Sequence, residues 1–205
     1  MTAGVPLGES DTVLLMIHGR NAAPKNILDL AEQLDNPDFS YVAPAAAGNT
    51  WYPYSFMAVK DQNEPGLSSG LWVMDHLLRD LADRGIRKEN VILLGFSQGA
   101  CLTAEFAARH AARFAGVIVY SGGLIGPPGT QWEYDGSFEG TPVFLGCSDV
   151  DSHVPQTRVD ESAAVFERMG AQVTKRIYPS MGHLVNDDEI AFTRELMSEV
   201  IAAAR

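Results

Sequence analysis

The amino-acid sequence predicts an α/β protein: a doubly wound, mostly parallel sheet with helices on both faces. Three observations predict it. Short apolar runs recur along the chain, helical patterns separate them, and 205 residues with 46% hydrophobic content suit one compact core. Runs that are apolar at consecutive positions are typical of strands buried on both sides. We therefore predict a single domain over residues 1–205.

Six segments have the composition of buried strands. They are 12–17 (TVLLMI), 41–45 (YVAPA), 91–96 (VILLGF), 116–120 (GVIVY), 142–146 (PVFLG) and 173–178 (VTKRIY). Most are continuously apolar rather than alternating, which favours parallel pairing. Parallel neighbours need crossover connections, so helices are expected between them.

Five segments between or after these runs have helical patterns. They are 26–34, 67–84, 98–109, 157–169 and 188–204. In the second, Leu71, Met74, Leu78 and Leu81 recur at helical spacing, and Gly85 supplies a stop. Strand and helix therefore alternate, as the doubly wound architecture requires.

Residues 124–140 (LIGPPGTQWEYDGSFEG) lack periodicity and are rich in Gly and Pro, which predicts a long loop after a strand. Two interpretations stay open. The loop borders a ligand pocket, with Trp132 or Tyr134 facing a substrate, or it is a surface excursion held down by those aromatic side chains.

Composition excludes several classes of partner. The chain has 15 basic and 26 acidic side chains, a net charge of −11 and no basic cluster, so neither nucleic acid nor an anionic membrane is an expected partner. No apolar run is long enough for a membrane span, and MTAGVPLGES lacks the organisation of a signal peptide. We expect a cytoplasmic protein without membrane insertion. Cys101 and Cys147 are expected to be buried and unpaired.

The segment GFSQG matches the pattern GxSxG, with Gly95, Ser97 and Gly99 at the fixed positions. The match alone is modest evidence, but it ends a predicted strand and begins a predicted helix, as a nucleophile elbow does. A serine on such a sharp turn needs small neighbours where helix and strand approach each other. Ser97 is therefore a candidate nucleophile.

A serine nucleophile needs a base and an acid that orients the base, and after an elbow these follow in the order acid, then histidine. CSDVDSHVP offers Asp149 and Asp151, and PSMGH offers His183. Each candidate follows a predicted strand, at the same edge of the sheet as Ser97. The residues alone leave the choice of aspartate open, and the other one is expected to cap a turn.

The other histidines are expected to be structural. His76 and His110 lie in predicted helices, His153 is too close in sequence to Asp151 to be its natural partner, and His18 belongs to a loop. DVDSH carries metal-binding atoms, but no second cluster completes a coordination shell, so neither metal nor cofactor is predicted.

Acyl transfer also needs donors for an oxyanion. One is expected to be the backbone N–H of Gln98, which follows the nucleophile, and the other the N–H of Arg20 or its neighbour in the loop IHGRN. The Arg20 side chain is then available for a surface ion pair or for a polar substrate group.

Four segments together resemble the carboxylesterase and acyl-protein thioesterase group, or phospholipase/carboxylesterase family, of serine α/β-hydrolases. They are HGRN (18–21), GFSQGA (95–100), SDVDSHVP (148–155) and GH (182–183), and the likeness spans nearly the whole chain. The resemblance implies an α/β-hydrolase fold without a separate cap domain. It also implies a catalytic triad of Ser97, Asp151 and His183, which selects the second aspartate.

The same resemblance assigns the loop donor to Arg20, beside Gln98, and implies that Trp51 lies near the acyl pocket. The chain departs from the family pattern at Asn21, where a second glycine is common, and at Ser148, where a glycine commonly precedes the aspartates. A β-carbon at Asn21 is expected to narrow the oxyanion loop.

These residues predict a carboxylic ester hydrolase that forms an acyl-enzyme, acting on a small-molecule ester with a short to medium acyl group. One alternative is an acyl-protein thioesterase or lysophospholipase acting on long acyl chains. Another is a binding module that keeps the fold without turnover. A dienelactone-hydrolase-like enzyme is disfavoured, because that group has cysteine at the elbow. A homodimer is one option for the quaternary state.

Overall fold

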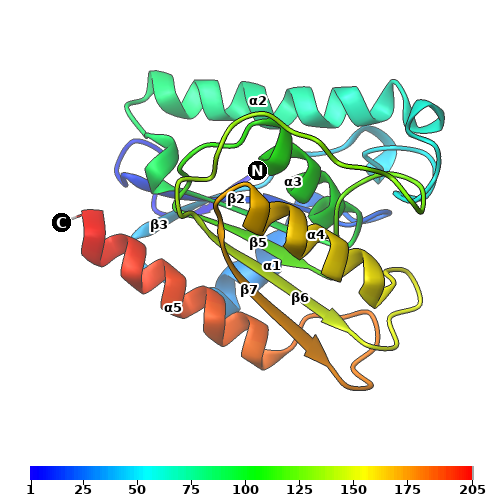
Figure 1. Cartoon of the computed structure of the whole chain (residues 1–205). Coiled ribbons are helices and arrows are strands. Elements are labelled where there is room, and N and C mark those ends of the chain that lie inside the picture. The colour runs from blue at the N-terminus through cyan, green and yellow to red at the C-terminus, as the bar shows by residue number, and fades with distance from the viewer. Residues whose placement is uncertain (205) are drawn as a thin grey trace.

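The computed structural model describes residues 1–204, and their centre is a seven-stranded sheet in the order β1-β3-β2-β4-β5-β6-β7 (Figure 1). The strands are β1 (Thr2–Gly4), β2 (Thr12–Ile17), β3 (Phe39–Val42), β4 (Val91–Phe96), β5 (Gly116–Tyr120), β6 (Pro142–Ser148) and β7 (Gln172–Tyr178). Only the pairing of β1 with β3 is antiparallel. The predicted mostly parallel sheet is confirmed.

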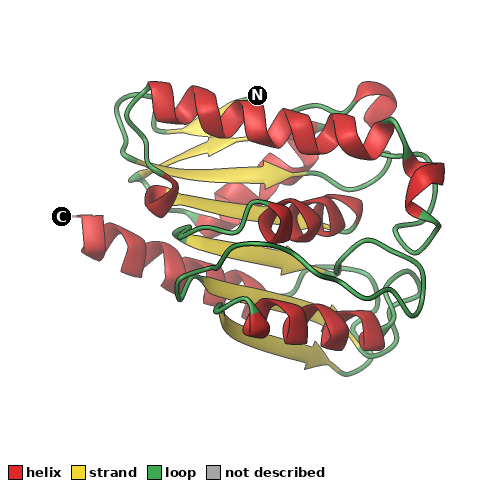
Figure 2. Cartoon of the chain, turned by 45° about the horizontal axis from the view of Figure 1, so that its top comes forward, coloured by secondary structure: helices red, strands yellow, loops and turns green. Residues whose placement is uncertain are grey.

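Five α-helices cover the two faces of this sheet. They are α1 (Pro24–Leu34), α2 (Gly66–Asp83), α3 (Gln98–Arg109), α4 (Gln156–Arg168) and α5 (Asp187–Ala204). Figure 2 shows α2, α3 and α4 side by side on one face, and α1 and α5 pack on the other. Short 3₁₀ turns occupy Ala47–Asn49, Lys60–Asn63 and Lys88–Asn90.

The two helical layers explain why the strands are apolar at consecutive positions. In β2, Val13 and Leu15 pack into the core under α2, α3 and α4, whereas Leu14 and Met16 pack into the core under α1 and α5. Because both faces of the strand are excluded from water, a polar side chain is disfavoured at the positions that face either helical layer. The same alternation runs through β4 and β5.

Two strands, β1 and β3, differ most from the sequence prediction, whereas β6 extends two residues past the predicted 142–146 and β7 begins one residue before the predicted 173–178. β3 begins at Phe39 and ends at Val42, rather than spanning 41–45, because its register pairs Phe39 with Thr12 and leaves Pro44 beyond the sheet. β1 was not predicted, because it is a three-residue antiparallel edge strand without a buried apolar run.

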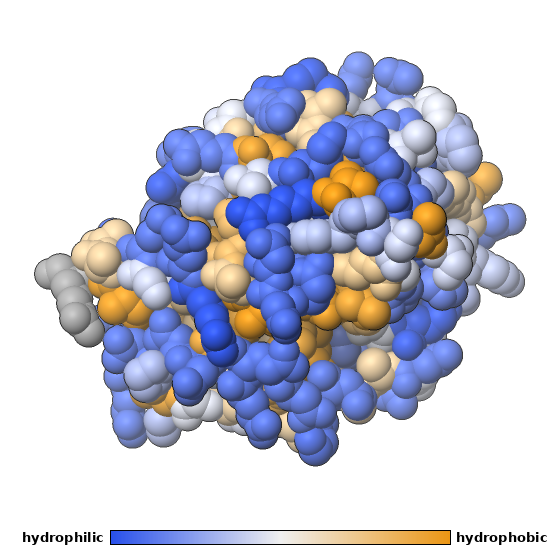
Figure 3. Space-filling model, turned by 90° about the horizontal axis from the view of Figure 1, so that it is seen from below, coloured by the Kyte–Doolittle hydropathy of each residue, from blue (hydrophilic) through white to orange (hydrophobic). Residues whose placement is uncertain are grey.

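The face of the molecule seen in Figure 3 is mainly hydrophilic, with apolar residues in smaller groups between the hydrophilic ones. No helix within residues 1–204 is long and apolar enough to cross a membrane. Cys101 and Cys147 are free and buried, as predicted.

The loop 124–140 contains neither helix nor strand, and hydrogen bonds from its aromatic side chains fix its position. The Trp132 indole N–H donates to the carbonyl oxygen of Ile125 at 3.1 Å, and the Tyr134 hydroxyl donates to the Glu105 carboxylate at 2.9 Å. Glu105 is fully buried in α3. Of the two interpretations left open by the sequence, this geometry supports the second.

Glu189, in the first turn of α5, is a buried carboxyl group. Its Oε2 accepts the Asn186 N–H at 2.9 Å, but its Oε1 has no hydrogen-bond partner among the described residues. Burial raises the pKa of Glu189 to about 7. The protonated acid is therefore the form that the folded protein favours.

Stability should consequently fall with rising pH in a defined window. An unfolded glutamate ionises near pH 4.5, so the stabilisation is complete below that pH and is lost as pH rises through about 7. The free energy of unfolding is expected to fall by up to about 3 kcal/mol across this window. Glu189→Gln should remove that fall, which urea unfolding at several pH values would measure. If the free energy of unfolding fell with pH equally in wild type and variant, the raised pKa could not belong to Glu189.

Candidate active site

Ser97 stands at the junction of β4 and α3 with φ 57° and ψ −120°. Such a backbone conformation costs about 1–3 kcal/mol and persists only where surrounding contacts enforce it. The Ser97 N–H donates to the carbonyl oxygen of Tyr120 at 3.0 Å, which ties the turn to the neighbouring strand β5. The strained turn holds the hydroxyl at the carboxyl edge of the sheet.

The two glycines of the motif allow helix and strands to approach closely. A β-carbon on Gly95 would collide with the backbone of Gly99, and one on Gly99 would collide with the carbonyl oxygens of Ile17 and His18. The N-terminus of α3 is thereby pressed against the end of β2. The loop that follows β2 is in ordinary van der Waals contact with this turn, since a β-carbon on Gly19 would lie 3.4 Å from the Ser97 β-carbon.

A continuous hydrogen-bonded chain connects Ser97, His183 and Asp151. The distance from Ser97 Oγ to His183 Nε2 is 2.8 Å, and that from His183 Nδ1 to Asp151 Oδ2 is 2.7 Å. Because a carboxylate only accepts hydrogen bonds, Nδ1 carries the proton and Nε2 is left to accept the serine O–H. The structure thus brings together the three residues that the resemblance selects.

Asp151 is held ionised by its neighbours. Burial opposes its charge, but hydrogen bonds from His183 and from the N–H groups of His153 (2.8 Å) and Val154 (3.0 Å) outweigh burial and lower the pKa of the carboxyl. The carboxylate is therefore a fixed acceptor and negative charge beside the imidazole.

Asp149 has a different position from Asp151. Its Oδ1 accepts the Ser180 N–H at 2.8 Å, within the loop that carries His183. The neighbouring Ser148 hydroxyl accepts the Gly182 N–H at 3.0 Å. Ser148, at the position where the family commonly has glycine, thus adds a contact to this loop. Asp149 binds the loop backbone, and Asp151 contacts the histidine.

Two backbone N–H groups are available beside Ser97. Gln98 is the first residue of α3, so its N–H has no acceptor within the helix. In the loop after β2, the Asn21 N–H donates to Asn49 and the Ala22 N–H donates to Gly19, whereas no described residue accepts the Arg20 N–H. Of Arg20 and its neighbour Asn21, the free donor is Arg20.

Asn21 explains how the loop keeps its shape without a second glycine. Its φ of 59° is in the left-handed region, which glycine adopts freely and asparagine tolerates better than most residues. Asparagine thus replaces the glycine that is common in the family, and the loop keeps the backbone conformation that suits glycine.

The Arg20 side chain binds backbone and hydroxyl groups of the protein rather than a carboxylate. Its guanidinium donates to the Thr50 hydroxyl (3.1 Å) and to the carbonyl oxygens of Pro53 (2.8 Å) and Tyr54 (2.6 Å). It therefore fastens the segment 50–54 to the loop after β2. No ion pair of Arg20 is present within residues 1–204.

Gln98 holds the same segment through its side chain, which sequence reasoning missed. Its Oε1 accepts the Trp51 N–H at 2.9 Å, and its Nε2 donates to the Tyr52 carbonyl oxygen at 2.8 Å. The signal available in the sequence was a polar residue at the first position of a helix, followed by three small residues, Gly99, Ala100 and Cys101.

Trp51 lies behind the site rather than in it. Its side chain is buried, its indole N–H donates to the His18 carbonyl oxygen at 2.9 Å, and its ring packs on the His18 ring. Two other aromatic residues of this segment, Tyr52 and Tyr54, line the cavity at Ser97. His18 is structural, as expected, since its ring is buried, with Nδ1 2.8 Å from the Gly19 carbonyl oxygen and Nε2 accepting the Ala46 N–H at 3.2 Å.

The cavity beside Ser97 has a volume of about 630 Å³. Its buried wall is mainly apolar apart from Gln98, and its exposed rim is mainly polar. The buried wall residues include Tyr52, Phe56, Cys101 and Val154, and the exposed rim residues include Arg20, Asn21, Tyr54, Ser55 and His153. A ligand here would place an apolar part inward and a polar part outward.

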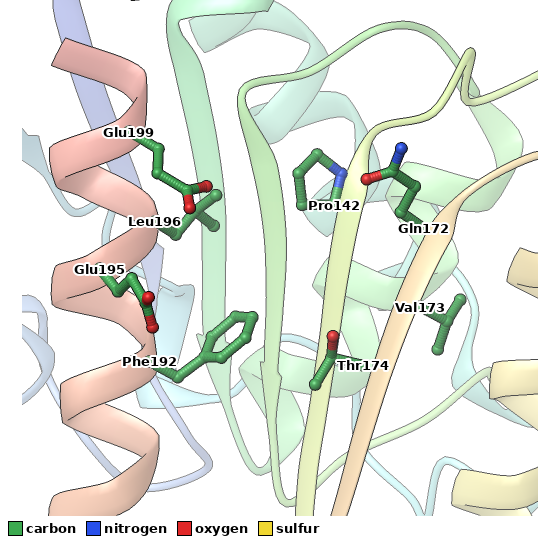
Figure 4. A pocket seen from close by; sticks show the side chains of 8 residues that line it. All are labelled: Pro142, Gln172, Val173, Thr174, Phe192, Glu195, Leu196 and Glu199. Atoms are coloured by element: carbon green, nitrogen blue, oxygen red, sulfur yellow. The ribbon is translucent and has the colours of Figure 1, made fainter. Parts of the chain in front are cut away.

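A second hollow, of about 260 Å³, lies between α5 and the strands β6 and β7 (Figure 4). In the figure, Phe192, Glu195 and Glu199 extend from α5, opposite Pro142 and Gln172. Pro142 and Gln172 are the first residues of their strands, so this hollow is at the opposite edge of the sheet from the Ser97 site. It contains no nucleophile beside a base.

Fold and site define a member of the phospholipase/carboxylesterase family of hydrolases. The profile of that family, Phospholipase/Carboxylesterase, matches residues 6–201, so the chain belongs to it and the predicted α/β-hydrolase fold is confirmed. The crystal structure of a phospholipase/carboxylesterase from Dyadobacter fermentans is similar, with a TM-score of 0.93 and 38% identity. That match covers 97% of this chain and 95% of the other.

More distant relatives carry more specific names. Acyl-protein thioesterase 1 of Aspergillus fumigatus is 27% identical over 147 residues, which cover 70% of this chain and 61% of the fungal protein. The match thus spans less than two thirds of that relative. Lysophospholipase-like protein 1 of mouse is 21% identical over 203 residues, covering 90% of this chain and 85% of the mouse protein.

Proposed function

We propose that the protein is a serine carboxylesterase that hydrolyses esters through an acyl-enzyme. The observation that carries the proposal is the hydrogen-bonded chain from Ser97 through His183 to Asp151, at a cavity with an apolar wall. A serine hydroxyl becomes a nucleophile when a base removes its proton and an acid orients that base. The three residues have this order and this geometry.

In the first half of the reaction, Ser97 Oγ attacks the ester carbonyl carbon while its proton passes to His183 Nε2. The carbonyl oxygen becomes an oxyanion, which the N–H groups of Arg20 and Gln98 stabilise. The C–O bond to the leaving group then breaks, and His183 returns the proton to the departing alcohol. Asp151 keeps the imidazole in the required tautomer and stabilises its charged form.

In the second half, water replaces the alcohol. His183 Nε2 takes a proton from the water, which attacks the acyl carbon, and the same N–H groups stabilise the second oxyanion. The bond to Ser97 Oγ breaks, the proton returns to the serine, and the carboxylic acid leaves. No cofactor is required for either half.

Acyl-chain length separates the carboxylesterase from its alternative, a thioesterase or lysophospholipase. The names of the fungal and mouse relatives, acyl-protein thioesterase 1 and lysophospholipase-like protein 1, favour the alternative. The bulky Tyr52 side chain is a buried part of the cavity wall, beside Cys101, and we take this wall to favour short to medium chains.

A fluorophosphonate probe and a substrate panel test the proposal. The probe should add one phosphonyl group to the chain, located on Ser97 by mass spectrometry. Esters and matched thioesters of increasing acyl length should be hydrolysed best at short to medium length. An unlabelled Ser97 together with no turnover would support the non-catalytic binding module, and a maximum at long acyl thioesters would support the thioesterase.

A further inference from the structure

His153 is a polar side chain at the cavity that the proposed reaction does not use. It lies exposed at the rim, in the segment between the acid Asp151 and the helix α4. Neither of its ring nitrogens has a hydrogen-bond partner in the part of the chain that the structure describes. Its backbone is fixed, because its N–H donates to Asp151 Oδ1 at 2.8 Å. The backbone of His153 is thus held in place, while its imidazole nitrogens have no hydrogen-bond partner among the described residues.

The position of the ring places it on the leaving-group side of the site. The His153 and His183 rings are in edge contact, with centroids 4.7 Å apart and planes at 67°. In the proposed reaction, His183 Nε2 gives its proton to the leaving group, so the leaving group must lie beside that imidazole. His153 is therefore within reach of substituents on the leaving alcohol.

The charge around the cavity is unlike that of the whole chain. The chain has 26 acidic side chains and a net charge of −11, yet no Asp or Glu is among the described residues that line this cavity. The Arg20 guanidinium, at the same rim, donates its hydrogen bonds to neutral acceptors, so no carboxylate balances its charge. An anionic group on a substrate would meet no like charge on the cavity wall and would find imidazole and guanidinium groups there.

We infer that His153 is a specificity-determining residue that binds a carboxylate on the leaving group, so that the preferred substrates are esters of carboxylate-bearing alcohols or phenols. The inference rests on the proposed esterase activity. The apolar inner wall takes the acyl group, and the rim, through the His153 imidazole, takes the anionic end. An imidazole donates a hydrogen bond in any protonation state and gains a charge-assisted one when protonated.

Matched esters test this assignment. The anion of m-acetoxybenzoate and its neutral methyl ester share one acyl group and one ring, and each kcat/KM is divided by the rate of spontaneous hydrolysis. The wild type should favour the anion by about tenfold, as a charge-assisted hydrogen bond at an exposed site allows. Phenyl hydrogen succinate against phenyl butanoate serves as the acyl-side control and should show no such preference; this pair is compared by kcat/KM without the correction, because the succinate carboxylate attacks its own ester in water.

Two variants locate the effect. His153→Phe keeps an aromatic ring against His183 but removes the donor, so the ratio of the two corrected rates should fall to about 1. His76→Phe, the same exchange at an exposed position on α2, should leave the ratio and both rates unchanged.

Each outcome decides one claim. A wild-type ratio near 1, a ratio that survives in His153→Phe, or a preference confined to the succinate would overturn the inference while leaving the esterase intact. Absence of turnover on every ester, with Ser97 unlabelled, would instead reject the esterase and the inference with it.

Discussion

Alanine at position 97 is expected to lower kcat on an aryl ester by on the order of 10⁵- to 10⁶-fold, because no other group in the site can replace the serine oxygen. Fold and stability should be retained. The Ser97 hydroxyl makes one hydrogen bond, to His183, so the free energy of unfolding should change by about 1 kcal/mol or less. Steady-state kinetics and urea unfolding of the Ser97→Ala variant measure the two quantities.

The control for this variant is covalent labelling. Ser97→Ala should not react with a fluorophosphonate, whereas the wild type should react at one site. Turnover of Ser97→Ala at even a hundredth of the wild-type rate would mean that another residue is the nucleophile, and the proposed reaction would be wrong.

Asp151→Asn is expected to lower kcat by about 10⁴-fold. An asparagine amide can donate to Nδ1, which would move the imidazole proton to Nε2 and remove the acceptor that Ser97 needs. It would also remove the negative charge that stabilises the imidazolium. The kinetics should show the loss mainly in kcat, since Asp151 does not line the cavity.

Asp149→Asn is the matched control, because it is the same exchange two residues away. The asparagine oxygen can still accept the Ser180 N–H, so activity should stay within a few-fold of wild type. Equal losses in the two variants would show that the loop, and not the contact of Asp151 with His183, limits turnover. A loss confined to Asp149→Asn would reverse the assignment of the two aspartates.

Much of the fold could be predicted, because burial on two sides leaves a clear pattern in sequence. The ranges predicted for β2, β4 and β5 match the structure, since every residue or nearly every residue in them is apolar and buried. The edge strand β1 could not be predicted, because three half-exposed residues carry no periodicity. The range predicted for β3 is shifted toward the C-terminus. Pro44 and its apolar neighbours have the composition of strand residues, but they lie beyond Val42, the last residue of β3 that pairs with β2.

The site, like the fold, has residues that could be predicted from the sequence and residues that could not. Motif spacing and chain order indicated Ser97, His183 and a pair of aspartates, and only the resemblance chose between the two. Nothing local indicated that Trp51 would lie behind the cavity and Tyr52 in it. Neighbouring residues of an irregular segment can point to opposite sides, and the direction is decided by contacts distant in sequence, here those made by Gln98.

The fastening of segment 50–54 has a consequence for changing this protein by design. One wall of the cavity is attached through the side chains of Arg20 and Gln98, whose own N–H groups are the proposed oxyanion donors. Substrate range and catalytic rate are therefore not separable variables in this segment. Mutations that reshape it to admit bulkier acyl groups would shift the donors as well, whereas substitutions at His153, which contacts neither Arg20 nor Gln98 through a hydrogen bond, leave both attachments in place.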